Sequence, residues 1–232
     1  MNGSRPRQQA VYGDNPREDV APFIPANATS VLEVGCGRGG FGITLRRRLG
    51  DDVTIVGVEA MPSEAAVARE AHGFDEVLTG YFPEILAGRN DRFDVIVFND
   101  VLEHILEPWD VLDQAHERLT PKGCVVAAIP SIQYAPVVMG LLRGRWDYSD
   151  TGTLDRTHVR FFTKSSMVMM FEKAGYRVEQ CTGANSVYSS DWSNRRTSRR
   201  WVWLRLKRRV WLRLVPDSEW LHFMVVATSL RA

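Results

Sequence analysis

The stretch that decides the fold runs from residue 31 to residue 42 and reads VLEVGCGRGGFG. Its glycines fit two patterns, each of which places a tight bend after a strand. Gly35, Gly37 and Gly40 match G-x-G-x-x-G, the fingerprint of NAD- and FAD-binding folds. With Glu33 in front, Gly35, Gly37 and Gly39 match E-x-G-x-G-x-G instead, which would mean S-adenosylmethionine. The glycines alone leave both cofactors open, so the rest of the chain has to decide.

Strands and helices alternate along the first 130 residues. Apolar, β-branched runs predict strands, and runs with helical spacing that are bounded by Pro, Ser or Gly predict helices. We predict strands at 30–35, 53–59, 75–80, 93–100 and 124–130. We predict helices at 42–50 and 62–73, within 16–25 with an end before Pro25, and within 108–123 with an end before Pro121. Continuous apolar strands between helices indicate a parallel sheet that is covered by helices on both faces.

The C-terminal part adds two strands. After an irregular, aromatic-rich stretch, residues 164–175 have a helical pattern, and residues 176–183 and 221–230 are predicted strands that pair antiparallel at the sheet edge. The predicted fold class is therefore α/β, a Rossmann-like, doubly wound, mostly parallel seven-stranded sheet with an antiparallel edge strand. In such a fold the ligand lies at the carboxyl ends of the strands.

Composition divides the chain into four parts. They are a flexible N-terminus (1–14), a cofactor-binding core (15–130), an insert or lid on the acceptor side (131–163), and the C-terminal part of the core (164–232), which includes a basic, Trp-rich helical segment (195–216).

The overall composition is that of an ordinary globular domain. Hydrophobic residues make up 44% of the 232 residues, and charged residues make up 25%. The three cysteines lie far apart and form no C-x-x-C pair, so we expect no metal site and a reducing, cytoplasmic setting. We see no signal peptide and no run of 18 apolar residues, so we expect no transmembrane helix.

The net charge of +1 hides one basic segment. Nine Arg or Lys and no acid lie between Arg195 and Arg213, so the rest of the chain carries a charge of −8. Basic residues and Trp in 195–216 suit peripheral contact with anionic lipid at the inner face of a membrane, or with phosphates of an acceptor. A helix packed on the body, or on a second subunit of an oligomer, explains the same pattern. We expect no nucleic-acid binding, because no other basic patch supports it.

Two glutamates flank the bend. Glu33 occupies a strand position that points into the sheet, where burying an acid costs free energy unless a cation or a donor meets it. The sulfonium and amino groups of S-adenosylmethionine would meet it. Glu59 ends the second strand, 20 residues after Gly39, where its carboxylate can accept hydrogen bonds from ribose hydroxyls. Both cofactors contain ribose, so Glu59 indicates a nucleoside without choosing between them.

The stretch FDVIVFNDVLEHILEPWDVL, residues 93–112, favours one cofactor. From Asn99 to His104 it reads NDVLEH, and it resembles class I S-adenosylmethionine-dependent methyltransferases. More narrowly, it is similar to the branch that includes ubiquinone-type O-methyltransferases and bacterial enzymes that modify sugars, glycans and natural products. NPREDVAPFIP (15–25) and LDRTHVRFFTKSSMVMMFEKAGYRVEQ (154–180) also resemble that branch.

The resemblance implies which residues of this chain form the cofactor site. The residues that would surround the methionine and ribose parts of the cofactor are Glu33, Gly35, Gly37, Gly39, Glu59, Asn99 and Asp100. After the third strand many relatives carry an acid that contacts adenine, whereas this chain reads Gly80, Tyr81 and Phe82. We therefore expect backbone N–H groups and stacking on Tyr81 or Phe82 to hold the adenine.

Two histidines are candidates for the acid–base step. A hydroxyl acceptor benefits from a base that removes its proton, and histidine suits this task near neutral pH. His104 directly follows the fourth strand, and His158 lies in the insert between Asp155 and Arg160. Each could have a structural role instead, His104 as a helix cap or packing residue and His158 as a hydrogen bond that fixes the insert.

The sequence thus predicts methyl transfer from S-adenosylmethionine to an oxygen of a glycan or small-molecule acceptor. Three alternatives stay open at this point. They are N- or C-methylation of a small metabolite, NAD-dependent oxidoreduction, and a non-catalytic, membrane-associated scaffold.

Overall fold

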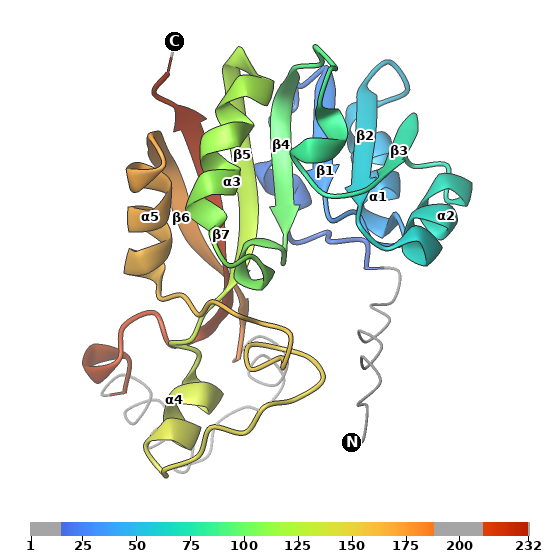
Figure 1. Ribbon diagram of the computed structural model, residues 1–232. Coiled ribbons are helices and arrows are strands. Elements are labelled where there is room, and N and C mark those ends of the chain that lie inside the picture. The colour runs from blue at the N-terminus through green and yellow to red at the C-terminus, as the bar shows by residue number, and fades with distance from the viewer. Residues whose placement is uncertain (1–14, 188–210, 232) are drawn as a thin grey trace, which may run out of the picture.

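A computed structural model describes residues 15–187 and 211–231 of the chain (Figure 1). The strands are β1 (Ser30–Val34), β2 (Thr54–Glu59), β3 (Glu76–Thr79), β4 (Phe93–Asn99), β5 (Leu119–Pro130), β6 (Tyr176–Ser186) and β7 (Trp220–Ser229). The α-helices are α1 (Gly40–Leu49), α2 (Pro62–Glu70), α3 (Pro108–Ala115), α4 (Ala135–Leu141) and α5 (Lys164–Lys173). Short 3-10 turns cover Ala21–Phe23, Glu84–Leu86, Leu102–His104 and His116–Arg118.

The seven strands form one sheet with the order β3-β2-β1-β4-β5-β7-β6. Strands β1 to β5 pair in parallel, whereas β7 runs antiparallel between β5 and β6. This arrangement confirms the predicted fold class. The chain adds β2 and β3 on one side of β1 and then crosses to β4 on the other side, so the switch point lies between β1 and β4.

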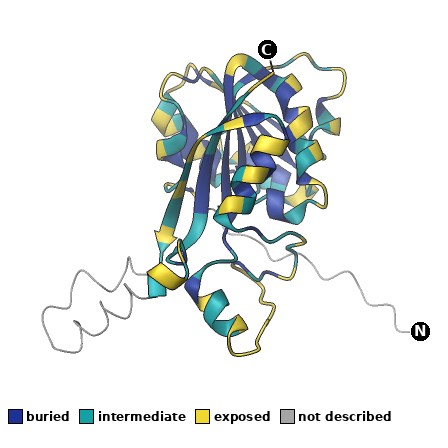
Figure 2. Cartoon of the chain, turned by 90° about the vertical axis from the view of Figure 1, so that its left-hand side faces the viewer, coloured by how far each residue is buried: buried dark blue, intermediate teal, exposed yellow. Residues whose placement is uncertain are grey.

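Helices cover both faces of the sheet, as the continuous apolar strands require (Figure 1). On one face α1 packs Phe41 and Leu45 against β1, β2 and β4, together with the turn at Ala21–Phe23. On the other face Leu112 of α3 and Phe171 of α5 pack against the central strands. Figure 2 shows the strands buried in the middle of the molecule and the exposed residues on the outer sides of the helices.

The insert, residues 131–163, lies below the carboxyl ends of the parallel strands in Figure 1. It contains α4, where the sequence pattern predicted no helix, and it returns to the sheet through a bridge between Ser131 and Phe162. None of the helices in the described ranges 15–187 and 211–231 is long and apolar enough to cross a bilayer. Most of the basic segment, residues 195–210, lies outside the described residues, as does the predicted flexible N-terminus 1–14.

Two helix predictions were wrong in extent. Residues 16–25 form only the 3-10 turn at Ala21–Phe23, because Arg17 has a left-handed backbone with φ of 44°. The helix predicted for 108–123 ends at Ala115, and β5 begins at Leu119. Pro121 is tolerated there because the register with β4 shifts, which leaves this residue exposed outside the regular ladder.

Candidate functional site

The glycine bend after β1 is closely packed at Gly35 and open at Gly37. Gly35 has φ of +73°, and a Cβ atom there would lie 2.6 Å from Cγ2 of Val101. Gly37 has φ of +51°, and, apart from its chain neighbours, no described residue places a heavy atom within 4 Å of the position of its missing Cβ. Gly39 precedes α1 as its N-cap. Glycine is therefore required for the backbone conformation, and at Gly37 the backbone faces space that a ligand can approach closely.

Glu33 lies at the switch point with one oxygen unsatisfied. It sits on β1 beside Gly57 of β2 and Val97 of β4, and only 2% of it is exposed. Nδ2 of Asn99 donates to its Oε1 at 3.0 Å, whereas its buried Oε2 has no hydrogen-bond partner among the described residues. Burial raises the pKa of Glu33 to about 8. A cation or a donor would remove this penalty, as the sequence analysis expected.

Glu59 ties the end of β2 to the glycine bend. Its two oxygens accept hydrogen bonds from the backbone N–H groups of Gly37 at 2.9 Å and of Met61 at 2.8 Å. Each carboxylate oxygen has a second lone pair, so the group can also accept from a ligand hydroxyl. Glu59 thus both shapes the bend and offers acceptors at the end of β2.

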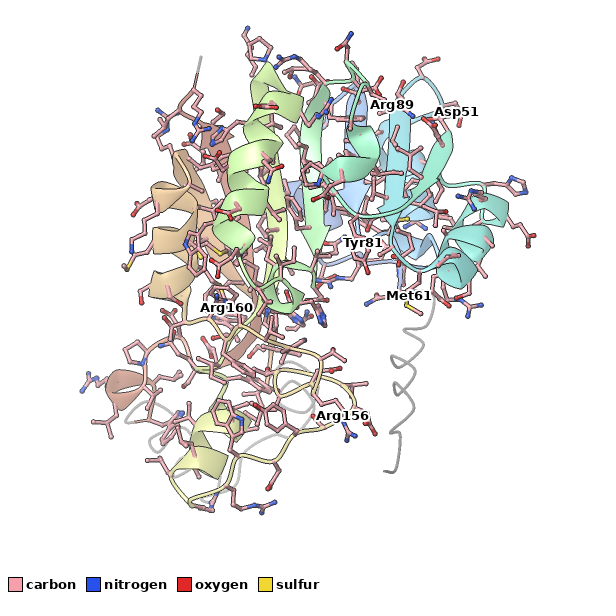
Figure 3. The ribbon with its side chains drawn as sticks, viewed as in Figure 1. Asp51, Met61, Tyr81, Arg89, Arg156 and Arg160 are labelled. Carbon is pink, nitrogen blue, oxygen red and sulfur yellow. The ribbon has the colours of Figure 1, made fainter. Side chains whose placement is uncertain are left out.

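Tyr81 lies at the same side of the sheet, where the parallel strands have their carboxyl ends. Figure 3 shows Met61 and Tyr81 at the lower edge of the sheet, whereas Asp51 and Arg89 lie at the opposite edge. The Tyr81 ring is 74% exposed, and Phe82 is buried in the core. Of the two rings expected to stack on adenine, only that of Tyr81 is accessible.

The side chain of Asp100 contacts Arg17 and His222 instead of Glu33. It has a left-handed backbone with φ of 52°, and its Oδ2 pairs with Nη1 of Arg17. Its Oδ1 lies 3.1 Å from Nε2 of His222. Although burial raises the pKa of Asp100, His222 and Arg17 outweigh that effect and hold it at about 2. Asp100 therefore stays ionised at neutral pH, and Asn99 rather than Asp100 contacts Glu33.

A pocket of about 380 Å³ opens beside this ion pair. Its walls include the hydrogen-bonding side chains of Arg17, Asp19, Asp100, Asn185 and His222. A second pocket of about 520 Å³ lies within the insert, between α4 and the loop that ends at Leu154. The carboxyl edge thus has a polar pocket near the switch point and a separate one in the insert.

The structure brings His104 and His158 together next to Glu103. The centres of the two imidazole rings are 4.7 Å apart. Nε2 of His158 lies 3.8 Å from Oε1 of Glu103, and both carboxyl oxygens of Glu103 are buried without a hydrogen-bond partner among the described residues. Burial, and then the negative charge of Asp100, raises the pKa of Glu103.

Backbone carbonyls determine the tautomer of each of these two rings. Nδ1 of His104 faces the carbonyl of Thr157 at 3.3 Å, and Nδ1 of His158 faces that of Thr153 at 3.0 Å. A carbonyl only accepts hydrogen bonds, so each Nδ1 carries the hydrogen and each Nε2 keeps its lone pair. Burial, followed by the neighbouring His158, lowers the pKa of His104. In the neutral form of each ring, Nε2 can therefore accept a hydrogen bond, and Nε2 of His158 lies beside Glu103.

The same cluster could hold a cation. Glu103, His104 and His158 each offer one ligand atom, and these three atoms lie within 4.8 Å of one another. The cysteine pattern did not predict such a group. The expectation that the protein uses no metal stays a prediction, and this cluster is where a metal titration would test it.

Three residues of this edge were missed by sequence reasoning. Arg17 is 6% exposed and contacts Asp100, Glu103 is fully buried, and His222 begins the last strand beside Asp100. A signal existed for Glu103, because the NDVLEH stretch contains it. The sequence analysis treated His222 as ordinary, since nothing local sets it apart.

Comparisons with known proteins identify the family. A family model described as "Methyltransferase domain" matches residues 8–181. A ubiquinone biosynthesis O-methyltransferase from Cereibacter sphaeroides is 30% identical over 162 residues, which cover 68% of this chain and 64% of that protein. The chain therefore matches less than two thirds of that relative's length.

Solved structures share the fold at low sequence identity. An S-adenosylmethionine-dependent methyltransferase from Archaeoglobus fulgidus superposes with a TM-score of 0.65 at 15% identity over 90% of each chain. A plantazolicin methyltransferase, solved with S-adenosylhomocysteine, superposes with a TM-score of 0.59 at 13% identity over 88% of this chain and 78% of that one. The cofactor question raised by the glycines is answered in favour of S-adenosylmethionine. The chain belongs to the methyltransferase domain family, as a class I S-adenosylmethionine-dependent methyltransferase that resembles the ubiquinone-type enzymes.

Proposed function

We propose that this protein transfers a methyl group from S-adenosylmethionine to a hydroxyl oxygen of a small molecule, with a sugar or glycan as the preferred acceptor class. The observation that carries the proposal is the buried, unsatisfied oxygen of Glu33 beside an open glycine bend. Family membership supports the reaction class, and similarity to O-methyltransferases supports oxygen as the target atom.

The residues at the bend suit the parts of this cofactor. S-adenosylmethionine supplies an activated methyl group when it is bound. Glu33 would face the positively charged methionine end, and Arg17 offers a guanidinium for the carboxylate of that end. Gly35, Gly37 and Gly39 would let the backbone approach the cofactor. Glu59 would accept hydrogen bonds from the ribose hydroxyls, and Tyr81 would stack on the adenine.

The polar pocket supports a hydroxylated acceptor. Asp19, Asn185 and His222 line it, and side chains of these types exchange hydrogen bonds readily with hydroxyl groups. A phenol of the kind implied by the name of the ubiquinone-type relatives is the second candidate, because Trp146 packs edge-on against Tyr148 and Phe161 in the insert. Flat aromatic faces suit sugars and phenols alike.

His104 and His158 are proposed catalytic residues that contact the acceptor from the insert side. Their free Nε2 atoms can accept a hydrogen bond from an acceptor hydroxyl, as an acid–base role requires. The insert between residues 131 and 163 would then act as the acceptor-side lid that the sequence pattern predicted.

A methyl-transfer assay tests this function. The full chain would be incubated with S-adenosylmethionine labelled in its methyl group and a panel of sugars, nucleotide sugars and phenols, plus matched amines. We expect label in at least one hydroxyl compound and none in its deoxy analogue. Labelling of amines alone would replace the proposal by N-methylation, and labelling of carbon positions would replace it by C-methylation.

Peripheral contact of segment 195–216 with anionic lipid is a separate part of the proposal. It rests on the basic and Trp-rich sequence of that segment. Sedimentation with vesicles of phosphatidylglycerol should retain the full chain and lose a variant that lacks 195–216. If both sediment equally, the segment serves another role, such as packing on a second subunit.

A further inference from the structure

His222 reaches the carboxyl edge because β7 runs in the opposite direction to its neighbours. It pairs with Pro130 at the end of β5 and with Ala184 of β6. In an antiparallel strand the first residues, not the last, lie at the carboxyl edge of the parallel strands. His222 thereby lines the polar pocket together with Asp100, although the two are far apart in sequence.

The tautomer of His222 follows from its neighbours. Nδ2 of Asn185 donates to Oδ2 of Asp19 at 2.9 Å, which fixes the orientation of this amide, because a carboxylate oxygen accepts but does not donate. The same amide nitrogen lies 3.4 Å from Nδ1 of His222. An amide nitrogen only donates, so Nδ1 must be the acceptor nitrogen and Nε2 must carry the hydrogen.

Asp100 lies beside Nε2, the other ring nitrogen of His222. Nε2 of His222 lies 3.1 Å from Oδ1 of Asp100, which is an ion-pair distance, although this buried oxygen has no aligned hydrogen bond with any of the described residues. Its second oxygen pairs with Arg17. The charged groups that face the ring are therefore Asp100, Arg17 and Asp19, with Glu18 also in the pocket wall. An aspartate on one ring nitrogen leaves the other as a proton acceptor and stabilises the imidazolium that forms.

The pocket adjoins the predicted methyl-donor position. Asp100 follows Asn99, and the Asn99 side chain bonds to Glu33. Nε2 of His158, by contrast, is directed at the buried Glu103, and the His158 side chain is 7% exposed. Of these histidines, His222 is the one that lines the polar pocket next to the switch point.

We infer that His222 is a catalytic residue, the proton acceptor for the acceptor hydroxyl, and that Asp100 is its positioning residue. This inference rests on the proposed function. The hydroxyl displaces the long contact from Asn185 and binds Nδ1. Its O–H bond breaks, the proton moves to Nδ1, and the electron pair stays on the oxygen, which bonds the methyl carbon. The carbon–sulfur bond breaks, and its electron pair stays on sulfur.

The test compares His222→Ala with His72→Asn, a change at an exposed histidine at the end of α2. The acceptor is the compound labelled in the panel assay. We expect kcat of His222→Ala to fall on the order of 100-fold, while its affinity for S-adenosylhomocysteine stays within about threefold of wild type. Added imidazole should restore part of the rate in a saturable way. Asp100→Asn should lower kcat more than it changes KM for the acceptor.

A second measurement does not depend on turnover. Nitrogen-15 NMR of the full chain should show hydrogen on Nε2 of His222, and Asp100→Asn should weaken that preference. Hydrogen on Nδ1 would overturn the inference, as would a His222→Ala enzyme with near-normal kcat or one that imidazole does not rescue. If wild type transfers methyl groups but His222→Ala behaves normally, only this inference fails. If wild type neither binds S-adenosylhomocysteine nor transfers methyl groups, the proposed function itself fails.

Discussion

Glu33 and Glu59 each carry a carboxyl group, but the two groups differ in how fully the protein satisfies them with hydrogen bonds. Glu59 accepts two backbone hydrogen bonds and so is largely satisfied by the protein alone. Glu33 has one partner for two buried oxygens, which leaves a deficit that a cationic ligand can remove. We therefore propose that Glu33 faces the positively charged end of the cofactor.

Removing the carboxylate of Glu59 should weaken nucleoside binding. We expect Glu59→Ala to reduce affinity for S-adenosylhomocysteine at least about tenfold, because hydrogen bonds to charged groups contribute roughly 1.5–3 kcal/mol. Calorimetric titration measures this affinity, and Glu70→Ala on the exposed side of α2 is the matched control. Unchanged affinity in Glu59→Ala would refute the ribose assignment.

His158→Ala should slow turnover without loss of cofactor binding. We expect kcat to fall on the order of 100-fold, because the proposed acid–base contact of this residue with the acceptor would be lost. Steady-state assays and titration with S-adenosylhomocysteine separate the two quantities. A near-normal kcat would remove His158 from the mechanism and leave it as the hydrogen bond that ties the insert together.

At the scale of elements, the strands and most helices could be predicted from periodicity and from Pro, Ser and Gly at their ends. The structure places Glu33, Glu59 and Asn99 at one edge, because parallel strands all present their carboxyl ends there, and their contact with the cofactor stays a prediction. This reasoning did not find His222, because His222 lies near the start of a strand and not at its end. Its place at the site depends on the reversed direction of β7 and its pairing with β6, which the sequence indicates, and on its pairing with β5, which the sequence does not identify.

The capping box of α5 offers an element-scale test. Thr163 accepts from the backbone N–H of Ser166, and the Ser166 hydroxyl accepts from the backbone N–H of Thr163. We expect Thr163→Ala to lower the free energy of unfolding by about 1 kcal/mol, since the loss of an N-cap costs that much. Denaturant unfolding measures the change, and Ser63→Ala in the uncapped first turn of α2 is the control. A loss no larger than that of Ser63→Ala would show that the cap contributes little.

For the whole molecule, the arrangement that sequence reasoning could not supply is the meeting of distant segments. Arg17 comes from the N-terminal segment, Asp100 from the end of β4 and His222 from β7, yet the three form one network. Single-sequence patterns report on neighbours in the chain and on the faces of elements, so such a network becomes visible only after the strand order is known. The family resemblance predicted the cofactor, but it held no information about this network.

Burial of Glu33 should make stability depend on pH. Its pKa is raised from 4.5 to about 8 in the folded protein, so between these values the unfolded chain releases a proton that the folded chain keeps. The free energy of unfolding should therefore fall as the pH rises through this window. Glu33→Gln, which resembles the protonated form, should lack that part of the decline. Denaturant unfolding at pH 5 and pH 8 measures the difference, and parallel declines in both proteins would contradict the account.

We expect the glycine bend with its two glutamates to bind S-adenosylmethionine rather than a dinucleotide. Calorimetric titration of the full chain with S-adenosylhomocysteine and, separately, with NADH distinguishes the two ligands. We expect saturable binding of S-adenosylhomocysteine at one site per chain and no binding of NADH. Tight binding of NADH, with no binding of S-adenosylhomocysteine, would contradict it.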